Sequence, residues 1–219
     1  MKKPLYLLVL CLCISNFINA QYYSKSYVGL KGGANYSKFM PNELMKRFDD
    51  IGYVGKFGAY FGAFVNIELT DYVKIQPELI FALQGSSFKS ENIQFSDPEG
   101  FLITRGDYRT NINEFVISVP IMGQYFFSDL FYIEGGPQFA YSIDTSEKVK
   151  ETPIPAEFNN NNNNSPFDDL DKFDFGASIG LGYKVSDTFT LNGRYFFSLI
   201  SRNETIKSSI FNLGIEYQL

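Results

Sequence analysis

Apolar and polar residues alternate along most of this 219-residue chain. Alternation with a period of two places successive side chains on opposite faces of a β-strand. A tilted membrane-spanning strand needs about 9 to 11 residues, whereas strands of soluble proteins usually have about 5 or 6. The pattern predicts eight long strands, at residues 28–36, 56–69, 73–83, 115–125, 131–143, 173–185, 189–199 and 209–219.

The predicted connections alternate in length. Short links at 70–72, 126–130 and 186–188 separate long ones at about 37–56, 84–114 and 144–172, with a shorter one at 200–208. Short turns on one side and long loops on the other are typical of bacterial outer-membrane barrels. We therefore predict an all-β fold, an eight-stranded antiparallel up-and-down transmembrane β-barrel, with both termini on the periplasmic side. The 144–172 connection contains six asparagines, Asn159–Asn164, and we expect it to be a solvated, mobile loop.

A soluble eight-stranded barrel of the lipocalin type is the alternative, with its apolar face turned inward. The apolar face of the predicted strands has no charged residue and carries many Phe and Tyr rings, too many for the interior of eight strands. The opposite face carries glycines and charged residues. Four of these are cations, and each would cost up to about 2–4 kcal/mol in the middle of a bilayer. We therefore expect the apolar face to meet lipid.

The charged residues of the polar face should consequently line the lumen and neutralise one another. We expect Glu216 to reach both Lys31 and Arg194, and Glu68 to pair with Lys74 across the first short turn. Such pairs would plug the lumen. The predicted lumen ion network is Lys31, Glu68, Lys74, Glu78, Glu134, Lys184, Arg194 and Glu216.

Both ends of the chain resemble sorting signals. Residues 1–20 have a basic start, an apolar run and a small residue, Ala20, at the end, which predicts a secretory signal peptide and a barrel domain at 21–219. A transmembrane anchor is the alternative, but the apolar run is short for one. The only cysteines, Cys11 and Cys13, lie in this segment. The last eight residues resemble the signal read by the barrel assembly machinery, with Asn212, Gly214, Tyr217 and Leu219 at its key positions.

Composition excludes several functions. The chain has no histidine, which removes His-based catalysis and His metal ligation. Its formal charge of -5 argues against a nucleic-acid partner. A catalytic pair such as Glu134 and Glu216 is conceivable, but neutralisation by Lys31 and Arg194 is the simpler interpretation. The acidic stretch 168–171 does not match a calcium loop. We therefore expect no catalytic residues, no cofactor and no metal.

Several segments together resemble the PorT-like outer-membrane β-barrel proteins of Bacteroidota. They are Gly29–Phe39, Val119–Met122, Phe131–Phe139, Phe173–Tyr183 and Arg194–Tyr195, in the order of that family. The family usually has Glu before Ile-Pro, where this chain has Ser118. The resemblance implies a barrel in the cell outer membrane, and one family member assists protein secretion.

These observations predict a non-enzymatic outer-membrane protein with a structural or interaction role. Its expected partners are outer-membrane lipid, the barrel assembly machinery and an unidentified protein that binds its loops. The alternatives are a narrow porin-like channel for small solutes and an accessory component of a secretion system.

Overall fold

The computed structural model describes residues 26–41, 51–96, 102–152, 171–203 and 206–219. The predicted signal peptide, the asparagine run and most of the acidic stretch at 168–171 lie outside these ranges. Within them, no helix is long and apolar enough to cross a membrane.

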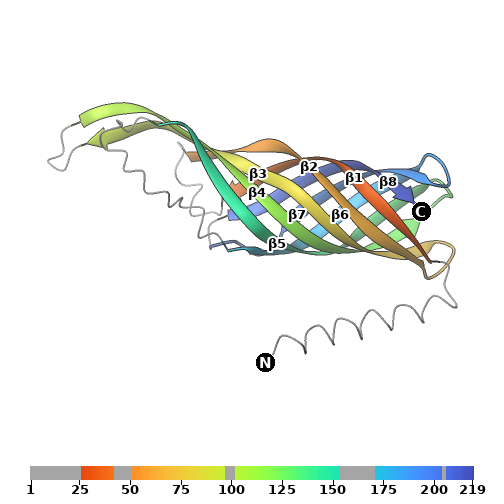
Figure 1. Cartoon of the computed structure of the whole chain (residues 1–219). Helices are drawn as coiled ribbons and strands as arrows, with labels where there is room; N and C mark the ends of the chain where they lie inside the picture. The colour runs from red at the N-terminus through yellow and green to blue at the C-terminus, as the bar shows by residue number, and fades with distance from the viewer. Residues whose placement is uncertain (1–25, 42–50, 97–101, 153–170, 204–205) are drawn as a thin grey trace, which may run out of the picture.

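Eight antiparallel strands form one closed barrel, as predicted (Figure 1). Each strand pairs with the next along the chain, and the last pairs with the first, for example through Lys31 opposite Glu216. This closure leaves no open sheet edge in the wall of the barrel. The strands are β1 (Ser26–Pro41), β2 (Ile51–Glu68), β3 (Val73–Ser96), β4 (Leu102–Phe126), β5 (Phe131–Glu151), β6 (Phe173–Lys184), β7 (Phe189–Ser198) and β8 (Ile206–Gln218).

Strands β1 to β5 run further than the sequence predicts, so the predicted loop boundaries at 37–56, 84–114 and 144–172 were wrong. β3 and β4 remain paired from Gln84 opposite Glu114 to Ser96 opposite Leu102, and β5 follows β4 as far as Glu151. We call residues 51–55, 84–96, 102–114 and 144–151 the projecting sheet. Figure 1 shows its β3–β4 hairpin extending well past the other strands at one end. Its residues are mostly polar, so the hydrophobic alternation that marks a strand is missing there.

The short connections lie at the opposite end of the barrel and are stabilised by hydroxyl groups. Thr70, Ser128 and Ser186 each accept a hydrogen bond from the backbone N–H three residues later, at 3.0–3.1 Å. Such side-chain-to-backbone bonds favour turns over continued strands. The sequence-predicted short links therefore correspond to tight turns.

The outer surface of the barrel is apolar and the interior is polar. Phe57 and Phe61 expose 84% and 62% of their surface, whereas Lys31 and Arg194 expose only 5% each. Rings also gather at both ends of the outer surface, as in the pairs Tyr36–Phe57, with centroids 5.1 Å apart, and Phe189–Tyr217, at 5.0 Å. Aromatic girdles flanking an apolar band are a property of transmembrane barrels.

Glycines let bulky side chains fill the narrow interior. A Cβ atom at Gly214 would lie 2.1 Å from the hydroxyl oxygen of Tyr60, and one at Gly33 would lie 2.1 Å from the backbone oxygen of Leu213. Both distances are far below van der Waals contact. The ring of Tyr60 can therefore cross the lumen only because β8 has no side chain at position 214.

Candidate functional site

The candidate functional site is the barrel lumen, where five charged side chains meet. We call Lys31, Glu78, Glu134, Arg194 and Glu216 the central ion cluster; they come from β1, β3, β5, β7 and β8. Lys31 Nζ donates to Glu78 Oε1 at 3.0 Å and to Glu216 Oε1 at 2.7 Å. Arg194 donates to both carboxylate oxygens of Glu78, at 2.7 and 2.8 Å, and to Glu134 at 2.8 Å. The five strands are therefore joined across the lumen.

The cluster has two cations and three carboxylates, and neutral donors bind the carboxylates as well. Gln76 Nε2 donates to Glu78 at 2.9 Å and to Glu216 at 3.2 Å. Gln124 donates to Glu134 at 3.3 Å, and the Tyr132 hydroxyl donates to Glu216 at 3.4 Å. Buried charges are tolerated only with such complete pairing and hydrogen bonding. The alternation places these neutral residues in the lumen, but their bonds to the carboxylates were not predicted from the sequence.

The partners within the cluster differ in part from those expected. Glu216 contacts Lys31, but Arg194 binds Glu78 and Glu134 instead of Glu216. Between Arg194 and Glu134 lies Gly180 of β6, where a Cβ atom would be 2.9 Å from the Glu134 carboxylate. The absence of a side chain at position 180 allows the guanidinium to pass over β6 and reach β5.

The remaining predicted lumen residues lie towards the short turns. Lys74 pairs with Glu68, and its ammonium also lies over the rings of Tyr27 and Phe126, at 5.5 and 5.1 Å from their centroids. The ammonium of Lys184 lies 4.9 Å from the Phe126 centroid. Among the described residues Lys184 has no carboxylate within ion-pair distance, so it is not part of the central cluster.

A second closure lies at the opposite end of the lumen, and we call Arg202 and Glu114 with their contacts the outer latch. Arg202 donates to both oxygens of Glu114, at 2.7 and 3.1 Å, and to the backbone oxygen of Asp171 at 2.6 Å. Its guanidinium lies 5.9 Å from the ring centroid of Phe39. Phe39 packs in a buried apolar cluster with Tyr53, Ile112 and Ile206.

Sequence analysis missed the outer latch because both charged residues fell in predicted loops. One signal was available for Glu114. It stands two positions before Val116 and four before Ser118, so a strand extended by one residue would have placed its carboxylate in the lumen. Nothing comparable was available for Arg202, which follows β7.

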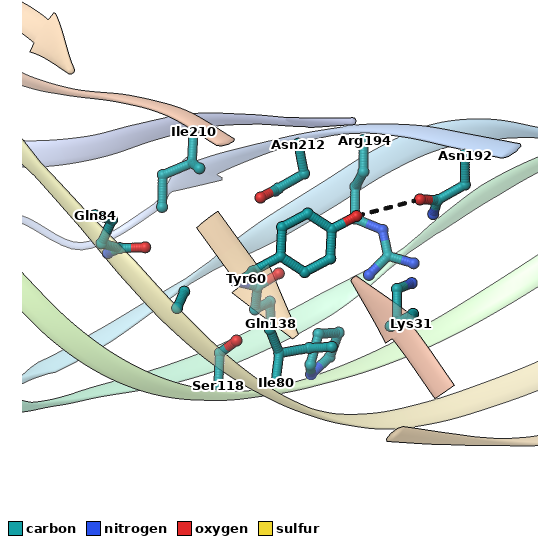
Figure 2. A pocket seen from close by; sticks show the side chains of 12 residues that line it. Lys31, Tyr60, Ile80, Gln84, Ser118, Gln138, Asn192, Arg194, Ile210 and Asn212 are labelled. Atoms are coloured by element: carbon teal, nitrogen blue, oxygen red, sulfur yellow. Dashed lines mark hydrogen bonds between the residues drawn. The ribbon is translucent and has the colours of Figure 1, made fainter. Parts of the chain in front are cut away.

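The space between the two closures is small, and both polar and apolar side chains line it. One cavity, of about 30 Å³, is lined by Tyr60, Gln84, Ser118 and Asn192, with Lys31 and Arg194 at one end. Figure 2 shows the Tyr60 hydroxyl pointing at Asn192, whose Oδ1 it contacts at 3.4 Å. A neighbouring cavity of about 10 Å³ continues towards Arg202. Since one water needs about 10–15 Å³ by this measure, the two cavities have room for a few waters and not for a larger solute.

Other predicted site residues occupy ordinary strand positions. Asn212 lines the cavity beside Tyr60, Gly214 faces the lumen, and Tyr217 and Leu219 lie on the exposed outer surface. Their role as an assembly signal remains a prediction. The described part of the chain contains no group of three Asp or Glu side chains arranged to hold a metal ion.

Solved structures with a similar fold include three bacterial proteins. The attachment invasion locus protein Ail of Yersinia pestis is 11% identical, with a TM-score of 0.45, and the match covers 89% of this chain and 99% of that chain. Neisserial surface protein A is also 11% identical, with a TM-score of 0.45, covering 88% and 97%. OprG from Pseudomonas aeruginosa is 9% identical, with a TM-score of 0.43, covering 89% and 95%. Similarity this low carries no argument about a ligand or an activity.

Family membership rests on the sequence instead. No curated protein is detectably similar to this chain. A family model described as an outer membrane protein beta-barrel domain matches residues 19–202, and this range includes seven of the eight strands of the barrel. The chain therefore belongs to the family of outer membrane proteins with this β-barrel domain, and its location is the outer membrane.

Proposed function

We propose that this protein is a non-catalytic, non-conducting barrel that anchors the projecting sheet at the cell surface, where the sheet contacts another protein. The observation that carries the proposal is the central ion cluster. Its five side chains expose at most 7% of their surface and join opposite walls of the barrel. An eight-stranded barrel has an interior just wide enough for side chains to fill, so this cluster leaves no path for a solute.

The same contacts argue against catalysis. Glu78, Glu134 and Glu216 are each bound by a cation, and the chain has no histidine. A general base must be free to accept a proton from its substrate. None of these carboxylates is free in this way, and the adjoining cavities have room for only a few waters.

The projecting sheet is the part of the described structure best placed for an interaction. Its last strand, β5, pairs with β4 as far as Glu151, whereas its pairing with β6 ends at Tyr141 opposite Phe173. Backbone groups of residues 144–151 are thus not paired to β6. An extended segment of another protein can add to such an edge through main-chain hydrogen bonds. On the motifs quoted above, we further assign the chain to the PorT-like proteins of Bacteroidota.

Single-channel recording tests the proposal. Purified protein in a planar bilayer should give no stable conductance steps, because the central ion cluster closes the lumen. As a positive control, an open eight-stranded barrel of comparable size should conduct under the same conditions. Regular, reproducible steps from the intact protein would overturn the proposal in favour of a narrow channel. Loss of export of a secreted protein on deletion of the gene would favour a secretion accessory instead.

A further inference from the structure

The ladder between β2 and β3 is interrupted near the outer end of the apolar belt. Gly55 pairs with Ser86 and Ala59 pairs with Leu83, so three residues of β2 stand opposite two of β3. This is the residue count of a β-bulge, which leaves backbone groups without their ladder partners. The wall of the barrel therefore needs another connection at this point.

Side chains of β1 supply that connection. Asn35 donates to the backbone oxygen of Leu83 at 3.1 Å. The Ser37 hydroxyl donates to the Gly85 oxygen at 2.7 Å and accepts from the Gly85 N–H at 2.8 Å. These bonds pass over Gly58, where a Cβ atom would lie 2.0 Å from the Leu83 oxygen, and Gly85 itself has a φ of 154°. The bulge is thus bridged from the lumen side.

A groove of about 440 Å³ lies at the bulge, lined by residues of both faces of the wall. Phe57, Ala59 and Leu83 line it within the apolar belt, and Phe57 is 84% exposed. At the lumen side the groove ends at Gln84 and at Glu114, whose carboxylate is fully bound by Arg202 in the outer latch. The volume falls in the range of small-molecule sites, roughly 300–1,000 Å³, and the surroundings of the groove are lipid.

Positive charge marks the end of the groove nearest the projecting sheet. Lys56 lines the groove, and its ammonium donates to Asn113 Oδ1 and to the Ile112 backbone oxygen. An ammonium has three N–H groups, so one N–H of Lys56 remains for a further acceptor. Lys150 lies near enough to act electrostatically on Lys56. A cation at the end of an apolar groove matches the chemistry of an anionic lipid.

We propose that this groove binds a phosphate-bearing lipid of the outer leaflet, with an acyl chain against Phe57 and Leu83 and the phosphate on Lys56. Filling the groove with an acyl chain is favourable because it keeps the apolar lining out of contact with water. One lysine near an anionic headgroup enriches that lipid about fivefold. The site is independent of whether the lumen conducts.

The chain has no tryptophan, so a single Phe57→Trp substitution provides a unique fluorescent reporter in the groove. The protein is reconstituted into phosphatidylcholine vesicles that contain a small fraction of brominated phosphatidylglycerol or brominated phosphatidylcholine. Bromine atoms quench tryptophan on contact. We expect phosphatidylglycerol to quench Trp fluorescence about fivefold more effectively than phosphatidylcholine at equal fraction.

Two further variants make the test specific. Phe61→Trp places the reporter two outward positions along β2, on the lipid-facing surface but outside the groove, and both lipids should quench it equally. Adding Lys56→Gln to Phe57→Trp should reduce the ratio of quenching by brominated phosphatidylglycerol to quenching by brominated phosphatidylcholine towards one. Folding of each variant is checked by its heat-dependent mobility in gel electrophoresis. Equal quenching of the Phe57→Trp reporter by both lipids, or a preference that survives Lys56→Gln, would overturn the proposal.

Discussion

At the scale of single residues, the stability of the barrel interior depends on which buried charges are paired with each other. Arg194 is the most connected member of the central ion cluster, because it binds Glu78 through two bonds and Glu134 through a third. Lys31 also binds Glu78, but Glu134 has no second cation among the described residues. Removing one partner of a buried pair leaves the other charge uncompensated, which is far more costly than losing a surface pair.

We therefore predict that Arg194→Gln lowers the free energy of unfolding by about 3–5 kcal/mol. The double variant Arg194→Gln/Glu134→Gln should recover part of this loss, because it removes the carboxylate that the single variant leaves unpaired. Urea unfolding in lipid vesicles measures the free energy of unfolding of both variants.

Lys89→Gln is the matched control, since Lys89 pairs with Glu91 at the surface. It should change the free energy of unfolding by less than about 1 kcal/mol. An Arg194→Gln variant as stable as this control would contradict the account of the cluster.

At the scale of elements, the two closures of the lumen are held differently. The central ion cluster uses side chains from five strands of the barrel wall, all held in register by the hydrogen-bonded ladder. In the outer latch, Glu114 belongs to β4, but Arg202 lies beyond the end of β7, in the connection to β8, where its backbone forms an isolated bridge with Ile206 outside the continuous ladder. Segments outside the ladder open locally at lower free energy than packed strands, so the outer latch is the weaker closure.

A cysteine reporter can measure how often the outer latch opens. Ser118 lines both cavities. Because the only cysteines of the sequence lie in the predicted signal peptide, Ser118→Cys gives a single thiol in the predicted mature chain. We predict that Arg202→Gln speeds labelling of this thiol by a water-soluble reagent by at least about tenfold, because a hydrogen bond to a charged group contributes about 1.5–3 kcal/mol.

Lys89→Gln serves as the control here as well and should leave the labelling rate unchanged. If Ser118→Cys reacts equally fast with and without Arg202→Gln, the latch does not close the lumen.

At the scale of the whole molecule, we expect the barrel to be stable without the β3–β4 hairpin of the projecting sheet. The central ion cluster lies within the barrel wall, whereas the β3–β4 hairpin beyond Phe88 and Thr110 contacts other parts of the projecting sheet, as Tyr108 does with Phe88 and Glu147. Phe88 packs against Tyr53, with ring centroids 5.4 Å apart, and so belongs to the base of the sheet.

We predict that replacing residues Lys89–Arg109 with an Asn-Gly turn leaves the barrel folded. Phe88 and Thr110 are paired, and Asn-Gly is favoured in two-residue hairpins. The shortened protein should keep its heat-dependent gel mobility and lose binding of any protein that recognises the hairpin. A shortened chain that no longer folds would show that the hairpin is part of the stability of the barrel.

The sequence alone determined the number of strands, their order, the lipid-facing side and the residues that face inward. Each follows from alternation of period two, a local property that can be read along one strand. It also predicted the pairing of Lys31 with Glu216, since β1 and β8 must be neighbours in a closed ring of eight strands.

Only the tertiary structure decided which charges meet across the lumen and how far the strands run. Arg194 reaches Glu134 because Gly180 leaves space between them, and Glu78 reaches Arg194 from the opposite wall. These contacts depend on register and side-chain length across strands distant in sequence. The projecting sheet was missed for a related reason: where both faces of a strand are polar, pairing with a neighbour, and not hydrophobic alternation, makes it a strand.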